Sequence, residues 1–148
     1  MRRFAIALLV IGLGAAGCGD DGDGGDGDGD DGAGVILTVY VADEPVAEWT
    51  LAELEAQLVF VTVELDGDEQ NGPRVLDVIA ASGVTDWRTA EILGKGEGRA
   101  FDIGIEATNV EIDDAWLFDI TNRGTLKLAA PNLPREQWVR DAGEIRIP

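Results

Sequence analysis

The amino-acid sequence predicts an α+β fold: a single compact, mainly-β domain with short helices over residues 35–148. Three observations predict this class. β-Branched and aromatic residues gather in several short runs, as strands prefer. Helical spacing of apolar residues extends over short windows only. Gly, Asn and Pro separate these segments at close intervals. Strands therefore outnumber helices, and one domain of about 115 residues is expected.

The first part of this domain should alternate strands with a short helix. Val35–Val41 is β-branched and aromatic, which predicts a strand. Thr50-Leu-Ala-Glu53 has the form of a capping box, so a helix should run from Leu51 to about Ala56. Residues 59–65 alternate with the period of a strand. One face of that strand should carry Val59, Val61, Val63 and Leu65.

Residues 66–73 are interpreted as a turn region, and one more helix and five strands should follow. Apolar residues from Val75 to Ala80 have helical spacing, and Gly83 is placed to end that helix. Residues 122–124 should form a tight hairpin connection. Pro134 can open a short helical turn that carries Trp138. The strands are expected at Arg88–Leu93, Arg99–Glu106, Trp116–Ile120, Thr125–Ala129 and Glu144–Ile147.

Residues 1–17 have the features of a secretory signal. Two arginines precede an apolar stretch, Phe4–Leu13, that is too short to span a bilayer. Small residues, Ala15 to Gly17, then lead to Cys18, the only cysteine in the chain. This arrangement resembles a bacterial lipoprotein signal peptide with its lipobox. The resemblance implies that Cys18 becomes the lipidated first residue of the mature protein, which is then anchored in a membrane of the cell envelope.

The alternative for Cys18 is a buried free cysteine in an apolar helix, and the nearby Asp20 and Asp21 weigh against it. The resemblance implies at least two acyl chains, a number that makes membrane attachment stable. Gly19 stands where, in enteric bacteria, an aspartate would favour retention in the inner membrane. The sequence therefore favours the outer membrane, with the domain facing the periplasm or the cell surface.

Charge and composition exclude several classes of function. Removing Arg2 and Arg3 from eleven basic residues leaves nine, against 29 acidic ones, a formal charge of −20. This charge argues against nucleic acid as a partner and against electrostatic docking on anionic lipids. The chain has no histidine and no second cysteine. A Cys/His zinc site, a catalytic triad with histidine and an intrachain disulfide are therefore excluded.

Residues 18–34 are expected to form an acidic tether behind the lipidated cysteine. Residues 20–31 read DDGDGGDGDGDD, with no apolar side chain to offset the entropy of ordering. A flexible spacer is the favoured interpretation. The alternative is an EF-hand calcium loop beginning at Asp26. Its sixth position would be Asp31 where the loop needs glycine, and its twelfth would be Leu37 where the loop needs glutamate.

The order of motifs in residues 35–148 resembles the molybdopterin-binding domain of the sulfite oxidase family. The resemblance rests on Leu51-Ala-Glu-Leu54 and on a helix ending in Ala-x-Gly-Val over residues 75–84. It rests further on Gly124-Thr-Leu-Lys-Leu-Ala-Ala-Pro131, followed by Arg135-Glu-Gln-Trp138-Val-Arg and a last strand. The family closes with Gly-Pro-Leu-Arg-Leu-Val-x-Pro and a Trp-Val-Lys/Arg. The resemblance implies that fold, with molybdopterin as a possible cofactor.

Several departures from the family's pattern bear on its chemistry. The family holds molybdenum through a cysteine inside the domain and surrounds the pterin with histidine and arginine, whereas this domain has neither cysteine nor histidine. The family's Gly-Pro is Gly124-Thr125 here, and its arginine is Lys127. Its Asp-Gly-Tyr element is Glu97-Gly98-Arg99. We therefore expect no bound cofactor and no catalytic residue.

A basic group near the C-terminus is the candidate binding site. Lys127, Arg135 and Arg140 lie close in sequence to Trp138 and could contact an anion or an acidic partner. The favoured interpretation, however, is that these cations pair with neighbouring carboxylates. Those carboxylates would be Glu136, Asp141 and Glu144.

Other candidates have simpler structural explanations. Glu111, Asp113 and Asp114 could do acid–base work, but a polar run between strands favours a solvated loop or a helix cap. Four tryptophans, at positions 49, 87, 116 and 138, are expected in the core or on strand faces. A surface cluster of them would instead mark a binding site.

Three hypotheses about function remain open at this point. The first is a lipid-anchored envelope protein with a non-catalytic role in binding or assembly, which implies an envelope protein partner. The second is an oxidoreductase component that binds molybdopterin alone or with a partner subunit. The third is a structural envelope lipoprotein without a ligand.

Overall fold

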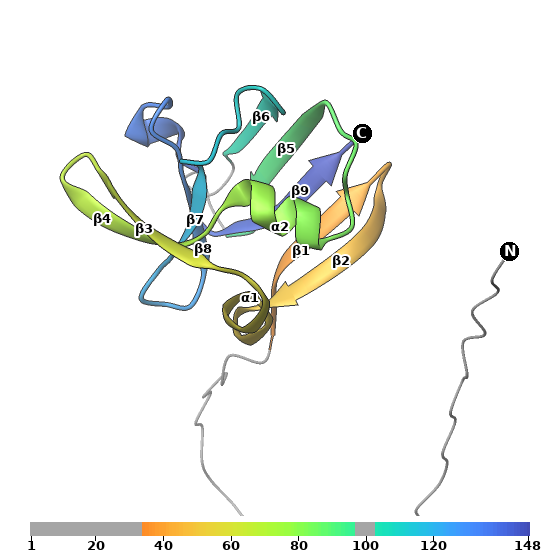
Figure 1. The fold of residues 1–148 in the computed structure, drawn as a ribbon, viewed down its shortest axis with the longest axis horizontal. Helices are drawn as coiled ribbons and strands as arrows, with labels where there is room; N and C mark the ends of the chain where they lie inside the picture. Colours follow the sequence, from red (N-terminus) through yellow and green to blue (C-terminus); the bar gives the residue numbers. More distant parts are fainter. Residues whose placement is uncertain (1–33, 97–102) are drawn as a thin grey trace, which may run out of the picture.

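A five-stranded sheet forms one side of the domain in the computed structural model, which describes residues 34–96 and 103–148 (Figure 1). Its strand order is β2-β1-β9-β5-β6. β1 pairs with β9 in parallel, and the other neighbours are antiparallel. The strands are β1 (Val35–Val41), β2 (Glu44–Thr50), β5 (Thr89–Gly94), β6 (Gly104–Thr108) and β9 (Ala142–Ile147).

Two antiparallel hairpins form a second layer. β3 (Phe60–Leu65) pairs with β4 (Asp68–Pro73), and β7 (Leu117–Ile120) pairs with β8 (Leu126–Ala129). β4 lies against β7: Arg74 forms a β-bridge with Leu117, and the Asn71 N–H donates to Asp119 Oδ1 at 2.8 Å. A Cβ on Gly72 would lie 1.8 Å from the Phe118 carbonyl oxygen, so only glycine permits this approach.

The helices are short, and local sequence signals mark where α1 begins and where α2 ends. α1 (Leu51–Gln57) begins with the predicted capping box, in which the Glu53 N–H donates to Thr50 Oγ1 and the Thr50 N–H donates to the Glu53 carboxylate. α2 (Val75–Ala81) is followed by Gly83 at φ +83°, the left-handed conformation expected of a glycine that ends a helix. A 3-10 turn, η1 (Arg135–Gln137), follows Pro134 and leads to Trp138.

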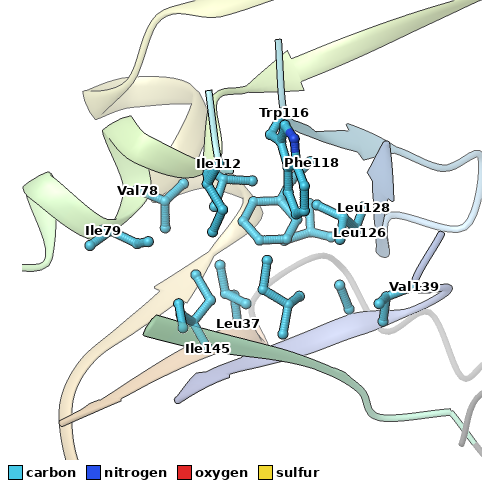
Figure 2. Close-up of a cluster of buried hydrophobic side chains, with 14 of the residues drawn as sticks. Leu37, Val78, Ile79, Ile112, Trp116, Phe118, Leu126, Leu128, Val139 and Ile145 are labelled. Carbon is cyan, nitrogen blue, oxygen red and sulfur yellow. The ribbon is translucent and has the colours of Figure 1, made fainter. Parts of the chain in front are cut away.

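The main hydrophobic core lies between the two layers, with α2 against it (Figure 2). Figure 2 shows Leu37 and Ile145 of the five-stranded sheet facing Phe118 of β7, while Val78 and Ile79 reach the same space from α2. A smaller cluster occupies the other face of the hairpin layer. It contains Leu117, Ala129 and Trp138, with Val61, Val63, Leu65 and Leu133 packed against them.

The mainly-β α+β class is confirmed, and most predicted elements are present within a residue or two. The interpretation of residues 66–73 as a turn region is wrong. Only Asp66 and Gly67 make the turn, at φ +54° and +81°, and β4 begins at Asp68. β2 was not predicted, because its sequence EPVAEWT contains proline and acidic residues that strands disfavour. Proline is tolerated there because β2 is an edge strand.

Two further details differ from the predictions. Val59 precedes β3 and is exposed, so it does not share the buried face of that strand. β6 begins at Gly104 among the described residues, and positions 99–102 of the predicted strand lie outside them. The predicted signal peptide, Cys18, residues 19–33 of the tether and Glu97-Gly98-Arg99 also lie outside the described residues. Within the described ranges, no helix is long and apolar enough to cross a membrane.

Candidate functional site

A basic cavity of about 230 Å³ lies between the β7–β8 hairpin and the segment that leads into β9. It contains all four residues of the candidate site, namely Lys127, Arg135, Trp138 and Arg140. The remaining residues of its lining are Thr121, Arg123 and Asp141. Four cations thus line one hollow in a chain whose formal net charge is −18.

Trp138 lines the cavity, and hydrogen bonds from its indole N–H fix the position of its ring. Its Nε1–H donates to the carbonyl oxygens of Ala130 at 3.0 Å and Leu133 at 3.3 Å. Lys127 Nζ lies 5.7 Å from the centroid of the ring, and the Arg135 guanidinium carbon lies 5.8 Å from it. Both distances are in the range of cation–π attraction. Because Trp138 is only 4 % exposed, it anchors the site mainly by orienting the two cations.

Lys127 and Arg135 each pair with a carboxylate that is distant in sequence. Lys127 Nζ lies 2.9 Å from Asp119, the residue directly opposite it in the β7–β8 ladder. Arg135 lies 2.8 Å from Asp68 at the start of β4. The expectation that these cations pair with neighbours such as Glu136, Asp141 or Glu144 is therefore wrong in its partners for Lys127 and Arg135. Pairing itself does occur: strand register sets the partner of Lys127, and the packing of η1 beside β4 sets the partner of Arg135.

Asp141 connects the hairpin loop to the start of β9. It adopts φ +45°, a conformation that aspartate tolerates better than most residues. Its carboxylate accepts two hydrogen bonds from Arg123 Nη2, at 2.9 and 3.1 Å, and one from Thr125 Oγ1 at 2.6 Å. This network fixes one wall of the cavity and neutralises the charge of Arg123.

Arg140 is the cation of this cavity that has no carboxylate within 4.0 Å among residues 34–96 and 103–148. Arg140 is exposed and lines the cavity. Four cations against three carboxylates leave one positive charge. A guanidinium offers paired N–H donors that match a carboxylate or phosphate. The arrangement can therefore hold one anionic group beside an aromatic ring.

Arg123 and Thr121 were missed as site residues by the sequence analysis. The sequence marked residues 122–124 only as a hairpin connection, and the structure confirms a turn there with Gly124 at φ +73°. The signal that could have found Arg123 is this same hairpin. Antiparallel pairing of the flanking strands brings the loop near Lys127, two residues beyond Thr125.

The acidic run at residues 111–114 has a structural role. The Glu111 carboxylate accepts hydrogen bonds from the N–H and the hydroxyl of Thr108, both at 2.8 Å. These bonds lower the pKa of Glu111, with the backbone bond contributing most. Asp113 Oδ1 accepts from the Ala115 N–H at 2.9 Å. Of the two expected structures, a solvated loop or a helix cap, the solvated loop is confirmed: Glu111, Asp113 and Asp114 are exposed in an irregular segment between β6 and β7.

Three tryptophans, at positions 49, 116 and 138, are buried, and Trp87 is partly buried against the core. The expectation that they are core or strand-face residues is confirmed.

The part of the chain that the structure describes contains no cluster of three or more His, Cys, Asp or Glu side chains able to hold a metal ion.

The donor set of the domain does not fit molybdenum. The chain's one cysteine is at position 18, outside residues 35–148, and no histidine is present. A thiolate from this domain is thus not available to a metal, and the cations of the basic cavity offer N–H donors instead of lone pairs.

No protein-family model matches this chain, and no curated protein matches it.

Proposed function

We propose that this chain is a lipid-anchored cell-envelope protein whose folded domain binds an anionic ligand or an acidic partner protein at the basic cavity. Its role is binding or assembly without catalysis. One observation carries the proposal: a chain with a formal net charge of −18 gathers four cations in the cavity that contains Trp138, and it leaves Arg140 without a carboxylate partner among the described residues. A positive surplus in a negative protein attracts one anionic group by charge complementarity.

Within this proposal, Cys18 carries the lipid, and residues 18–34 link the anchor to the domain. The order of elements and the closing motifs at residues 124–131 and 135–140 support a short relative of the sulfite oxidase molybdopterin-binding fold. Fold likeness does not carry function with it. The missing thiolate supports a relative that has kept the architecture and uses a different site.

The test uses the mature chain, residues 18–148, with Cys18→Ser in place of the lipidated residue. Inorganic phosphate and a penta-glutamate peptide are titrated into ¹⁵N-labelled protein, and amide signals of residues 121–125 and 138–141 are followed. Arg140→Gln should weaken binding of both probes by about three- to fivefold, the effect of losing up to about 1 kcal/mol at an exposed ion pair. Arg88→Gln removes an exposed arginine outside the cavity and should change nothing.

Equal affinities for the Arg140→Gln and Arg88→Gln variants would reject the cavity as the binding site.

Two further measurements test the other parts of the proposal. Labelled palmitate should enter the full-length chain in a bacterial host, and Cys18→Ser should abolish that labelling. Elemental analysis and pterin fluorescence of protein from a molybdopterin-competent host should find neither metal nor pterin. Stoichiometric cofactor would instead establish the oxidoreductase alternative.

A further inference from the structure

The folded domain begins beside the basic cavity. Val35 and Ile36, at the start of β1, line a neighbouring hollow of about 250 Å³. Thr125 and Asp141 line the same hollow, and Asp141 is also a wall of the basic cavity. Lys95, a further cation, lies in this neighbouring hollow. The first strand of the domain therefore begins beside the wall of the basic cavity that Asp141 forms.

The sequence that precedes Val35 is the most acidic part of the protein. Residues 20–31 contain seven aspartates and five glycines, and no basic residue lies between Cys18 and the domain. The basic cavity has one positive charge in excess, so the two parts of the chain are complementary in charge. Aspartate carboxylates are also the groups that the Arg140 guanidinium is suited to bind.

We propose that the acidic segment, residues 20–31, is an intramolecular ligand of the basic cavity and competes there with external anions. This inference rests on the proposed function, because it assigns an internal competitor to the same site. Arg140 takes one carboxylate of the segment. Lys95, which lines the hollow beside Val35, takes another.

The reach of the chain is sufficient for this contact. An extended chain spans about 3.3–3.6 Å per residue, so the aspartates from position 31 back to position 20 can reach roughly 13–50 Å from Val35. The glycines allow the chain to turn at any point in the segment. No aspartate needs a defined position, because seven equivalent carboxylates follow one another along the segment.

The strength of the contact follows from its intramolecular nature. A single exposed ion pair is weak, but a short flexible link gives the segment an effective concentration on the order of 1 mM at the cavity. If the intrinsic dissociation constant of the segment for the cavity is also near 1 mM, the segment is bound to the cavity in about half of the molecules. The apparent affinity for an external anion is then reduced about twofold, and more at low salt. A tighter anionic partner displaces the segment and frees it to extend between anchor and domain.

The experiment compares three forms of the mature chain, each with Cys18→Ser. The first keeps the natural segment. In the second, all seven aspartates at positions 20–31 become asparagine, and in the third they become glutamate, which keeps the charge. Amide signals of Arg123, Gly124, Arg140 and Asp141 are recorded at low salt. Inorganic phosphate is then titrated into each form.

The asparagine form should differ from the other two at these four amides, and it should bind phosphate about twofold more tightly. The differences should vanish in about 1 M NaCl, where charges are screened beyond roughly 3 Å. They should survive tenfold dilution of the protein, because an intramolecular contact does not depend on concentration. The glutamate form should match the natural one.

Identical signals and identical phosphate affinity in all three forms would overturn the inference while leaving the proposed function intact. A difference that disappears on dilution would place the segment on a second molecule and would also overturn it. Failure of every form to bind phosphate or penta-glutamate would instead reject the proposed function, so the two failures are distinguishable.

Discussion

Replacing Gly72 by alanine should separate the two hairpins whose packing supports the basic cavity. The new Cβ would lie 1.8 Å from the Phe118 carbonyl oxygen, whereas Cβ contacts under 3.0 Å essentially never occur. The oxygen belongs to the backbone of β7 and the Cβ is held rigidly on the backbone of β4, so the two strands must move apart by over an ångström. That movement removes the hydrogen bond from the Asn71 N–H to Asp119, 2.8 Å long, and disturbs the partner of Lys127.

The expected loss is about 3 kcal/mol. Overpacking of a tight contact costs roughly 1–3 kcal/mol, and a lost hydrogen bond adds about 1 kcal/mol. This loss is a large part of a total stability that is on the order of 5–15 kcal/mol. In a domain of this size, it should lower the midpoint of thermal unfolding by about 12 °C. Urea unfolding of the mature chain, followed by tryptophan fluorescence and circular dichroism, measures the change directly.

Gly67→Ala is the matched control. Gly67 lies in the β3–β4 turn at φ +81°, and a Cβ there would meet nothing within 4 Å. Its replacement should cost only the strain of a left-handed alanine, about 1 kcal/mol. If Gly72→Ala is no more destabilising than Gly67→Ala, the close approach of β4 to β7 is wrong, and with it the joining of the hairpins into one layer.

Two further predictions concern side chains that the structure distinguishes. Trp138→Phe should be more destabilising than Trp116→Phe, by about 1–2 kcal/mol in urea unfolding. The reason is that Trp138 Nε1–H donates to two carbonyl oxygens, whereas the buried Trp116 Nε1 has no partner among the described residues. Equal losses would contradict this assignment. Stability should fall as pH drops below about 4.5, since hydrogen bonds from Thr50 and Thr108 lower the pKa values of Glu53 and Glu111. Both carboxylates contribute above that pH and lose their contribution when protonated, so Glu53→Gln with Glu111→Gln should reduce the slope of unfolding midpoint against pH, and an unchanged slope would refute this cause.

The basic cavity shows how far a linear sequence can describe a binding site. Lys127, Arg135, Trp138 and Arg140 were predicted as a group because they fall within one short segment, and the structure does bring them together. Arg123 was missed because it reaches the cavity through a hairpin. The partners of Lys127 and Arg135 were assigned wrongly, because side chains pair with what lies opposite them in space.

By itself, the sequence determined the elements whose cause is local. The capping box at Thr50, the glycine after α2 and the β-branched run of β1 each specify their structure within a few residues, and the absence of histidine excludes whole classes of chemistry without reference to any fold. Only the tertiary structure decided that the acidic residues 44–50 and the glycine-containing residues 68–73 are strands. Their own propensities oppose that state, and hydrogen bonds to β1 and β3, together with the close contact at Gly72, outweigh those propensities. The free charge of Arg140 was decided in the same way, since it depends on which distant carboxylates the fold delivers to the cavity and which it directs elsewhere.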